Sequence, residues 1–230
     1  AQRAHDKINE QAEKINDSIF KHIKQQAVLE TMHLAKERGE SPDMAGSFRR
    51  NAHLLAIAPN ANSSLIAGTS PSIEPWKANA FTSRTRAGSH LVKNAYLTKI
   101  LASLDRDNEQ TWSSIITNGG SVQHFDWLSD EDKMVFKTAI EIDQDIIVRQ
   151  GGARQKYICQ GQSLNIFFPA GATKKYLHNI HYNAWKYGCK GLYYLRTESS
   201  HRAENVALKI ERDKLVDHME INEDECAACH

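Results

Sequence analysis

HLLAIAPNANSS, residues 53–64, is the stretch of sequence that decides the fold. Its first half, residues 53–58, is apolar and predicts a short buried strand. Its second half is a run of small amide and hydroxyl residues that stands before the apolar residues 65–67. Backbone N–H groups at a helix start, together with Ser and Asn side chains, can bind a phosphate. The same residues are also common in turns that bind nothing. The residues alone therefore leave an anion-binding turn and a plain turn both open.

Helices and short strands alternate along the rest of the chain. Helices are predicted over residues 95–104, 111–117, 133–140 with a cap at Ser129 or Asp130, 142–149 ended by Gly151 and Gly152, and 176–187 ended by Gly188. Strands are predicted over residues 156–168 and 191–196. Three of the five prolines lie between residues 59 and 75, which indicates a rigid and irregular connection. This order favours an α/β fold whose strands are buried on both faces.

The first part of the chain predicts one long helix. Apolar residues recur there at steps of three and four, on one face of a helix: Ile8, Ala12, Ile15, Ile19 and Ile23. Asp6 is the expected N-cap, and Gly39 is the expected end. A helix with so many isoleucines is expected to pack on a larger surface, which can belong to another chain.

Composition excludes several classes of protein. The 230 residues include 29 Lys and Arg against 28 Asp and Glu, a net charge of +1 that does not predict a nucleic-acid partner. The longest apolar runs are much shorter than the roughly 18 residues of a membrane helix. No secretory signal is visible, so the expected compartment is the reducing cytoplasm. The chain begins with Ala1 rather than Met, as a processed chain or a piece of a longer one would.

The composition changes after about residue 204. Few large apolar residues follow, and six acidic ones do: Asp213, Asp217, Glu220, Glu223, Asp224 and Glu225. The sequence therefore predicts one folded unit over residues 1–205 and a flexible acidic tail over residues 206–230. The tail ends in the pair Cys226 and Cys229, spaced as C-A-A-C, which is typical of a redox or metal-binding dithiol.

Several motifs, in this order, resemble the C-terminal part of the large catalytic subunit of class I ribonucleotide reductase. They are LAKERG at residues 34–39, the residues 50–64 that end in APNANSS, SIEP at 72–75, QGQSLN at 160–165, LYYLRT at 192–197 and ECAAC at 225–229. The resemblance covers most of the chain. It implies that the chain forms the second half of the α/β barrel of that family. It also implies reduction of ribonucleoside diphosphates to deoxyribonucleoside diphosphates by radical chemistry.

The resemblance assigns roles to three groups of residues. The substrate diphosphate is expected to bind at Pro59, Asn60, Ala61, Asn62, Ser63 and Ser64. Tyr193 and Tyr194 are expected to relay an oxidising equivalent, although neighbours in a strand point to opposite faces and stacking their rings requires a local irregularity. Cys226 and Cys229 are expected to re-reduce an active-site disulfide. The tail is expected to depend on the proximity of its thiols to the disulfide, because its acidic neighbours hold the thiol pKa values up.

The resemblance also implies partners. A small, metal-containing subunit would supply the radical, and thioredoxin or glutaredoxin would supply electrons. This chain itself is expected to bind no metal and no cofactor. No candidate is present for the family's radical cysteine, for the neighbouring Glu and Asn or for the effector site, so we expect a fragment or one half of a split subunit. Such a chain would need the complementary N-terminal portion and would be inactive alone, with an exposed apolar surface.

Two other interpretations remain. The chain could be a non-catalytic module that binds nucleotide phosphates. Alternatively, residues 226–230 match the C-x-x-C-H pattern of covalent haem attachment. The lack of an export signal and of residues beyond this pattern disfavours haem, and zinc would need one ligand more than Cys226, Cys229 and His230 supply. Residues 39–49 are short compared with many family members, so a different surface is expected there.

Overall fold

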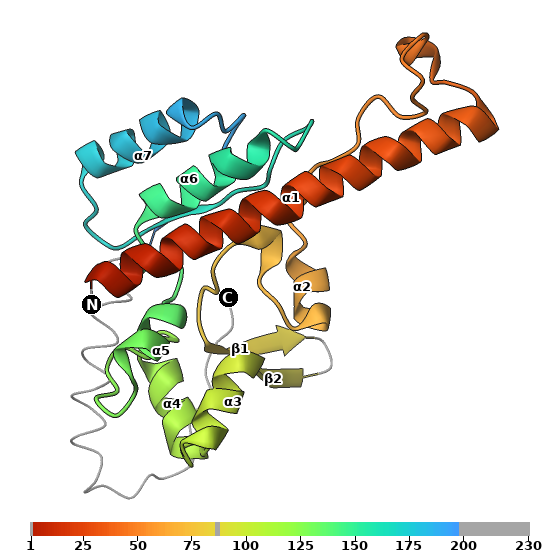
Figure 1. Ribbon diagram of the computed structural model, residues 1–230. Coiled ribbons are helices and arrows are strands. Elements are labelled where there is room, and N and C mark those ends of the chain that lie inside the picture. The colour runs from red at the N-terminus through yellow and green to blue at the C-terminus, as the bar shows by residue number, and fades with distance from the viewer. Residues whose placement is uncertain (1, 86–87, 198–230) are drawn as a thin grey trace, which may run out of the picture.

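The computed structural model describes residues 2–85 and 88–197, and Figure 1 shows their arrangement. The helices are α1 (Gln2–Arg38), α2 (Ala61–Ala67), α3 (Ala95–Ser103), α4 (Glu109–Thr117), α5 (Asp130–Val135), α6 (Gln144–Gln155) and α7 (Lys174–Lys186). Strands β1 (Ala80–Thr85) and β2 (Gly88–Lys93) form a hairpin, and β3 (Ile166–Phe168) pairs with β4 (Leu195–Thr197). Short 3-10 turns cover Pro42–Met44 and Pro71–Ile73. The mixed α/β class predicted from the sequence is confirmed.

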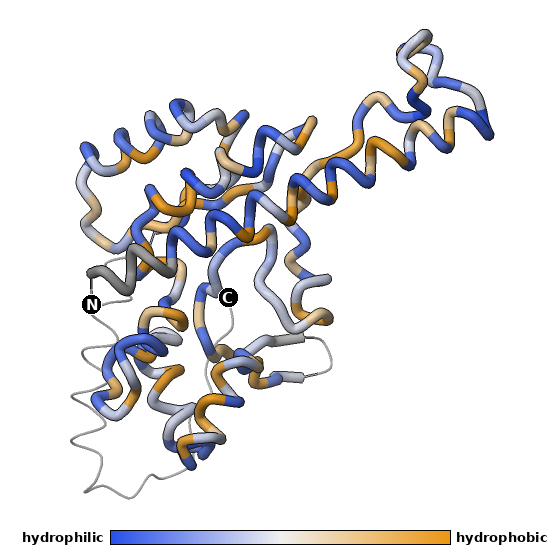
Figure 2. The backbone as a smooth tube through the Cα atoms, in the orientation of Figure 1, coloured by the Kyte–Doolittle hydropathy of each residue, from blue (hydrophilic) through white to orange (hydrophobic). Residues whose placement is uncertain are grey.

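Helix α1 is the longest element, and it crosses the molecule with α6 and α7 on one side of it (Figure 1). It begins at Gln2, so the prediction that Asp6 caps its start is wrong. Gly39 follows the last helical residue at φ +78°, a conformation that glycine adopts without strain, and the predicted end is confirmed. Figure 2 shows apolar and polar residues alternating along α1. Nevertheless Ile15, Ile19 and Ile23 are 51%, 49% and 40% exposed, so the described residues do not bury the apolar face.

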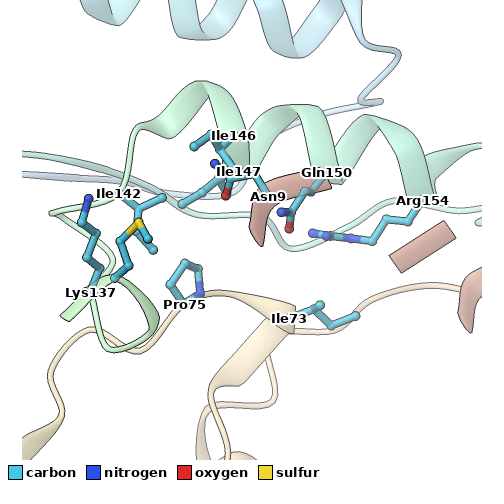
Figure 3. Close-up of a pocket in the computed structure, with 10 residues that line it drawn as sticks. Asn9, Ile73, Pro75, Lys137, Ile142, Ile146, Ile147, Gln150 and Arg154 are labelled. Carbon is cyan, nitrogen blue, oxygen red and sulfur yellow. The ribbon is translucent and has the colours of Figure 1, made fainter. Parts of the chain in front are cut away.

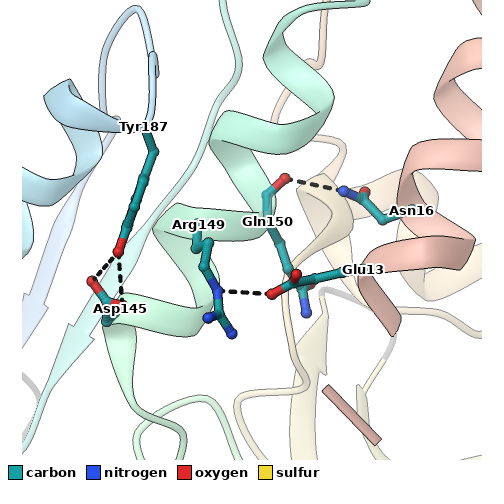
Figure 4. Close-up of polar contacts among 6 residues, drawn as sticks. All are labelled: Glu13, Asn16, Asp145, Arg149, Gln150 and Tyr187. Carbon is teal, nitrogen blue, oxygen red and sulfur yellow. Dashed lines mark hydrogen bonds and ion pairs between the residues drawn. The ribbon is translucent and has the colours of Figure 1, made fainter. Parts of the chain in front are cut away.

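Polar contacts hold α1 against α6 (Figure 4). Arg149 forms an ion pair with Glu13 at 2.7 Å, and the side-chain amide of Asn16 donates to the carbonyl of Gln150 at 3.1 Å. One helical turn further along α1, Asp17 pairs with Lys156 at 2.5 Å. These pairs are partly exposed, so each contributes little energy and they mainly fix the position of α1.

Three extended segments run parallel to one another. Ile166 of β3 pairs with Leu195 of β4, and Ile57 forms an isolated parallel bridge with Gln162. A parallel pair needs a crossover connection, and α7 provides it between β3 and β4. We call residues 53–58, 157–168 and 191–197, together with α6 and α7, the parallel-strand region.

Burial in the parallel-strand region differs from the prediction. All three residues of β3 are buried, but all three of β4 are exposed, and residues 53–58 are exposed or half-buried rather than forming a buried strand. The regular strands are also shorter than predicted, at 166–168 within 156–168 and at 195–197 in place of 191–196. Among the described residues, no strand pairs with the outer edge of β4 or of the 53–58 segment. Each of these segments therefore has a neighbour on one side only.

Gly151 and Gly152 lie inside α6 and do not end it, which corrects the prediction. A Cβ atom on Gly152 would lie 2.4 Å from the carbonyl oxygen of Tyr187, and one on Gly151 would lie 2.7 Å from Leu164. The glycines therefore allow α6 to approach the end of α7 closely. The Tyr187 hydroxyl fastens the same junction through Asp145 at 3.2 Å (Figure 4). The core below it contains Val148, Ile166, Phe168, Ile180 and Ala184.

A second core lies among α3, α4, α5 and β1, and we call residues 79–136 the Trp112 lobe. Its buried cluster is Ala80, Leu97, Leu101, Trp112, Ile115, Val122, Phe125, Leu128 and Phe136. Each of its three helices starts with a side-chain cap, from Asn94, Asn108 and Ser129. The predicted helices at 95–104 and 111–117 are confirmed, whereas α5 ends at Val135 instead of Ile140. The β1–β2 hairpin was not predicted.

Candidate functional site

The loop at residues 59–64 leads into α2. Asn60 precedes the helix at φ +50°, and its side chain makes no capping hydrogen bond. The amide of Ser64 bonds to the carbonyl of Asn60 at 2.9 Å. The three amides before it, at residues 61–63, belong to the first helical turn, where an α-helix offers no carbonyl to accept from them. The loop therefore presents consecutive N–H donors, and residues 59–63 are exposed.

A strained turn at residues 71–73 holds the start of this loop through a hydrogen bond. The hydroxyl of buried Ser72 donates to the carbonyl of Pro59 at 2.8 Å. Ser72 and Ile73 have φ of +55° and +59°, which is unfavourable for residues other than glycine and especially for a β-branched one. Such strain persists only where the surroundings fix it. A cavity of about 510 Å³ lies beside the loop, between Phe20, Ile23, Ile57, Ser63 and Ile73.

Tyr193 and Tyr194 lie immediately before β4. Their ring centroids are 4.1 Å apart, with an angle of 50° between the planes. They are 46% and 49% exposed and line a groove of about 440 Å³ with His181 and Trp185. A hydrogen bond with the Tyr194 phenol is the main cause that raises the pKa of Tyr193. Two adjacent phenols therefore contact one another at an open surface.

The rings are tilted rather than stacked, and the local irregularity that lets them meet is visible in the backbone hydrogen bonds. Tyr193 donates to the carbonyl of Leu164 at 2.8 Å, as in a regular ladder. The amide of Tyr194 donates instead to the side-chain oxygen of Asn165 at 3.1 Å. The carbonyl of Tyr194 also accepts from the amide of Ile166 at 3.0 Å, so two consecutive residues bond to the same neighbouring segment, whereas successive residues of a regular strand bond to opposite sides.

Asn165 is held in turn by a buried carboxylate. Its amide and its side-chain nitrogen donate to the two oxygens of Glu74 at 2.6 and 3.0 Å. Glu74 is 4% exposed, and burial raises the pKa of its carboxyl group, while the two bonds from Asn165 oppose that rise. The motifs at 72–75, 160–165 and 192–197 therefore meet in one network. From the sequence, Glu74 and Asn165 are only members of two motifs, and the signal that marks Glu74 is an acid in a Pro-rich stretch.

The registers of the parallel segments relate the loop to the tyrosines. Ile57 pairs with Gln162, so continuing that register sets Pro59 level with Leu164. Tyr193 bonds to Leu164 from the other side. The loop and the tyrosine pair therefore follow segments that lie on opposite sides of residues 162–164. Cys226 and Cys229, and the boundary predicted at residues 205 and 206, lie outside the described residues.

The described part of the chain lacks two kinds of feature. It holds no group of three or more His, Cys, Asp or Glu side chains placed to bind a metal ion. It also has no helix that is long and apolar enough to cross a membrane. Cys159 and Cys189 are free thiols.

The parallel strands connected by a helix define an α/β domain. Its donor-rich loop is a candidate phosphate site, and its exposed tyrosine pair is a candidate radical site. Comparison with known proteins identifies the class: residues 48–195 match the family described as "Ribonucleotide reductase, barrel domain". The chain belongs to this family.

The chain is 57% identical to the putative ribonucleoside-diphosphate reductase large subunit of Frog virus 3 (isolate Goorha) over 82% of its own length, but over 34% of that relative. It is 43% identical to the large subunit of Invertebrate iridescent virus 6, over 86% of the chain and 21% of the relative. The structure of the Actinobacillus ureae class Id ribonucleotide reductase alpha subunit matches with a TM-score of 0.75 and 37% identity, over 85% of this chain and 38% of that one. The chain thus spans between about a fifth and two fifths of the length of these proteins.

Proposed function

We propose that this chain is the C-terminal portion of a ribonucleoside-diphosphate reductase large subunit. In this role it reduces ribonucleoside diphosphates together with the complementary N-terminal portion. The observation that carries the proposal is the pair of exposed, contacting phenols of Tyr193 and Tyr194, inside the segment that matches the family. A phenol can release a proton and an electron together, which aliphatic side chains cannot do at comparable potentials. The free thiols of Cys159 and Cys189 agree with a reducing, cytoplasmic setting.

The tyrosines would relay an oxidising equivalent from a small, metal-containing subunit toward a cysteine in the N-terminal portion. Their exposure supports this role, because a relay between subunits must begin at a surface. Glu74 holds Asn165, and Asn165 holds the backbone of Tyr194, so Glu74 and Asn165 act as positioning residues for the tyrosine.

The loop at residues 59–64 would bind the substrate diphosphate through its amides. Neutral donors suffice, because the start of a helix carries a partial positive charge. Ser63→Pro removes one amide donor in the first turn, where proline costs no helical hydrogen bond. It is expected to raise KM for the substrate by roughly 10-fold, as for one lost charge-assisted bond. Ser63→Ala, which retains the amide, is the matched control, and an equal KM in both variants would argue against the loop.

Cys226 and Cys229 would pass electrons from thioredoxin or glutaredoxin to the active-site disulfide. The order of motifs supports this, since ECAAC is the last motif of the chain. Exchange proceeds by attack of a thiolate on a disulfide sulfur. Replacing both cysteines by Ser is expected to leave a single turnover intact, to stop repeated turnover with thioredoxin and to permit partial rescue by dithiothreitol.

The deciding experiment mixes this chain with an N-terminal portion of a large subunit, a small subunit and a ribonucleoside diphosphate. The expected result is formation of deoxyribonucleoside diphosphate by the mixture and none by this chain alone. The alternative, a non-catalytic phosphate-binding module, rests on the donor-rich loop itself. Tight association and nucleotide binding without any product would favour that alternative over the reductase.

A further inference from the structure

A cavity of about 140 Å³ lies between α1, the turn at residues 72–75 and α6 (Figure 3). Pro75, Ile146 and Ile147 provide apolar walls. Lys137 stands toward one end and Arg154 toward the other, and the amides of Asn9 and Gln150 complete the polar lining. This cavity is separate from the tyrosine groove, and it shares only Ile73 with the cavity beside the phosphate loop.

Arg154 is the unusual group in this cavity. Its side chain is 2% exposed, although a guanidinium is rarely buried without a partner. Its Nε donates to Gln162 at 2.6 Å, a neutral acceptor. Within the described residues, no acceptor bonds to the terminal guanidinium nitrogens, and these point into the cavity in Figure 3. These terminal nitrogens are not among the buried side-chain atoms that lack a partner, so their four N–H donors are open to the cavity and can bond to acceptors of a ligand there.

A network of amides holds the guanidinium in this orientation. Gln162 donates to the carbonyl of Gly151 at 3.0 Å and to the side chain of Gln155 at 2.9 Å. Gln155 donates to the carbonyls of Ile158 and Gln160. With its Nε fixed, the guanidinium cannot turn its terminal nitrogens toward another acceptor. The donors are therefore preorganised toward the cavity.

No carboxylate of the described residues satisfies Arg154. Glu74 is the nearest acidic influence, but both of its oxygens already accept bonds from Asn165. Burial lowers the pKa of Arg154 to about 10, against the opposing effects of Cys189 and Glu74, so the side chain stays charged at neutral pH. Lys137 adds a second positive charge to the lining.

We propose that this cavity binds a carboxylate carried on a short aliphatic stem, with Arg154 as its bidentate partner. A guanidinium matches the two oxygens of a carboxylate in planar geometry. The apolar walls suit a hydrocarbon stem and do not suit a phosphate dianion, which would lose hydration without enough donors. The carboxylate can come from a free small acid or from an Asp or Glu side chain of the N-terminal portion. The second source rests on the proposed function.

Butyrate is the probe, with butyramide as its uncharged isostere and inorganic phosphate as the alternative anion. Thermal unfolding and calorimetric titration are measured on the full chain. Butyrate is expected to raise the unfolding midpoint, and butyramide and phosphate are not. Arg154→Met is expected to abolish the response, and Arg154→Lys is expected to weaken binding by roughly 10-fold because it loses the planar donor pair.

Lys137→Met tests the same cavity without altering the buried network. It is expected to weaken the binding of butyrate by about 3-fold. Lys175→Met makes the same charge change at an exposed position of α7 and should leave the affinity for butyrate unchanged. If Arg154→Met does not fold, the comparison of Lys137→Met with Lys175→Met tests whether the cavity binds a carboxylate. An equal response to phosphate, or the same butyrate affinity in Lys137→Met and Lys175→Met, would overturn the proposal.

The complex with the N-terminal portion separates the two sources. If a side chain of that portion fills the cavity, butyrate no longer binds the complex, and Arg154→Lys weakens association of the two portions. If the ligand is a free acid, butyrate binds the complex and the chain alike. Because butyrate binding is measured on the chain alone, its failure is distinct from a failure of deoxynucleotide formation.

Discussion

The Trp112 lobe and the parallel-strand region differ in the size of their buried clusters, which hold nine and five residues, and in how their exposed aromatic residues are arranged. In the lobe, Trp112, Leu97 and Ile115 are at most 2% exposed, and side chains from the lobe itself cap all three helices. In the parallel-strand region, β3 is buried while β4, Tyr193, Tyr194 and Trp185 are exposed. One region is stabilised by its own contacts. The other has a smaller core, and its exposed aromatic residues Trp185, Tyr193 and Tyr194 gather around one groove.

The sharpest test of this difference is Tyr194→Phe. We expect turnover of the assembled enzyme to fall by roughly 1,000-fold or more, because the relay loses its ionisable hydroxyl. Stability should change by less than about 0.5 kcal/mol, since the side chain is half exposed. Tyr96→Phe is the matched control, because Tyr96 is 66% exposed in the Trp112 lobe and should retain full activity. Appreciable residual turnover in Tyr194→Phe would remove the proposed role.

Trp112→Ala should show the opposite behaviour. The indole is 2% exposed, its Nε1 donates to Asp107 at 2.6 Å, and Lys93 lies over its ring at 4.6 Å. Its removal should lower the free energy of unfolding by about 3–5 kcal/mol. Trp185→Ala, at a site 71% exposed on α7, should cost less than about 0.5 kcal/mol. Urea titration measures both, and similar losses would contradict the contrast between the two regions.

The buried acid Glu74, which bonds to Asn165 of the parallel-strand region, predicts a dependence of stability on pH. Burial raises the pKa of Glu74 above its ordinary value of 4.5, so the folded state holds this proton more tightly than the unfolded state. The resulting stability is present below pH 4.5 and is lost as pH rises through the raised pKa. As pH increases through this pKa, the free energy of unfolding of Glu74→Gln should therefore fall by less than that of the wild type.

Urea titrations at a series of pH values measure this effect, with Glu131→Gln on exposed α5 as the control. Parallel pH profiles for the wild type and Glu74→Gln would refute the expectation.

Loss of a helix cap should have the smallest effect. Asn108 accepts hydrogen bonds from the amide and the hydroxyl of Thr111 at 2.9 and 3.0 Å. Asn108→Ala should lower the free energy of unfolding by about 1 kcal/mol. Thr173→Ala removes the corresponding cap of α7, which accepts from Tyr176 at 3.1 Å, and should cost a similar amount. A near-zero cost at Asn108 would show that the lobe does not depend on its own caps.

The same contrast explains what the sequence could predict. Helices α3, α4 and α7 were found because local signals define them, namely a cap, an apolar period and, for α7, the closing Gly188. The sequence predicts that Gly151 and Gly152 end the helix, because only the close approach of Tyr187 shows why α6 needs glycine at these positions. Asp6 was misread as a cap because nothing local distinguishes it from an acid inside a helix.

For the site, the sequence predicted the loop and the tyrosine pair through family motifs. It could not predict the bond from Tyr194 to Asn165, nor the burial of Glu74 and Arg154, because these depend on segments far apart in the chain. The prediction that residues 53–58 are buried is wrong for a related reason. An apolar pattern shows that a segment can be buried, but it does not show whether another part of the chain covers it. The expectation for the tail concerns residues outside those described.

The parallel bridge between Ile57 and Gln162 also has a consequence for synthesis of the protein on the ribosome. In this neighbourhood, Leu54 meets Cys159 across 105 residues of sequence. At elongation rates of about 5–20 residues per second, the early segment waits roughly 5–20 s before its partner is made. During that interval its leucines and isoleucine have no strand to pair with. Nascent chains stalled between residues 60 and 160 should therefore bind ribosome-associated chaperones more strongly than longer ones.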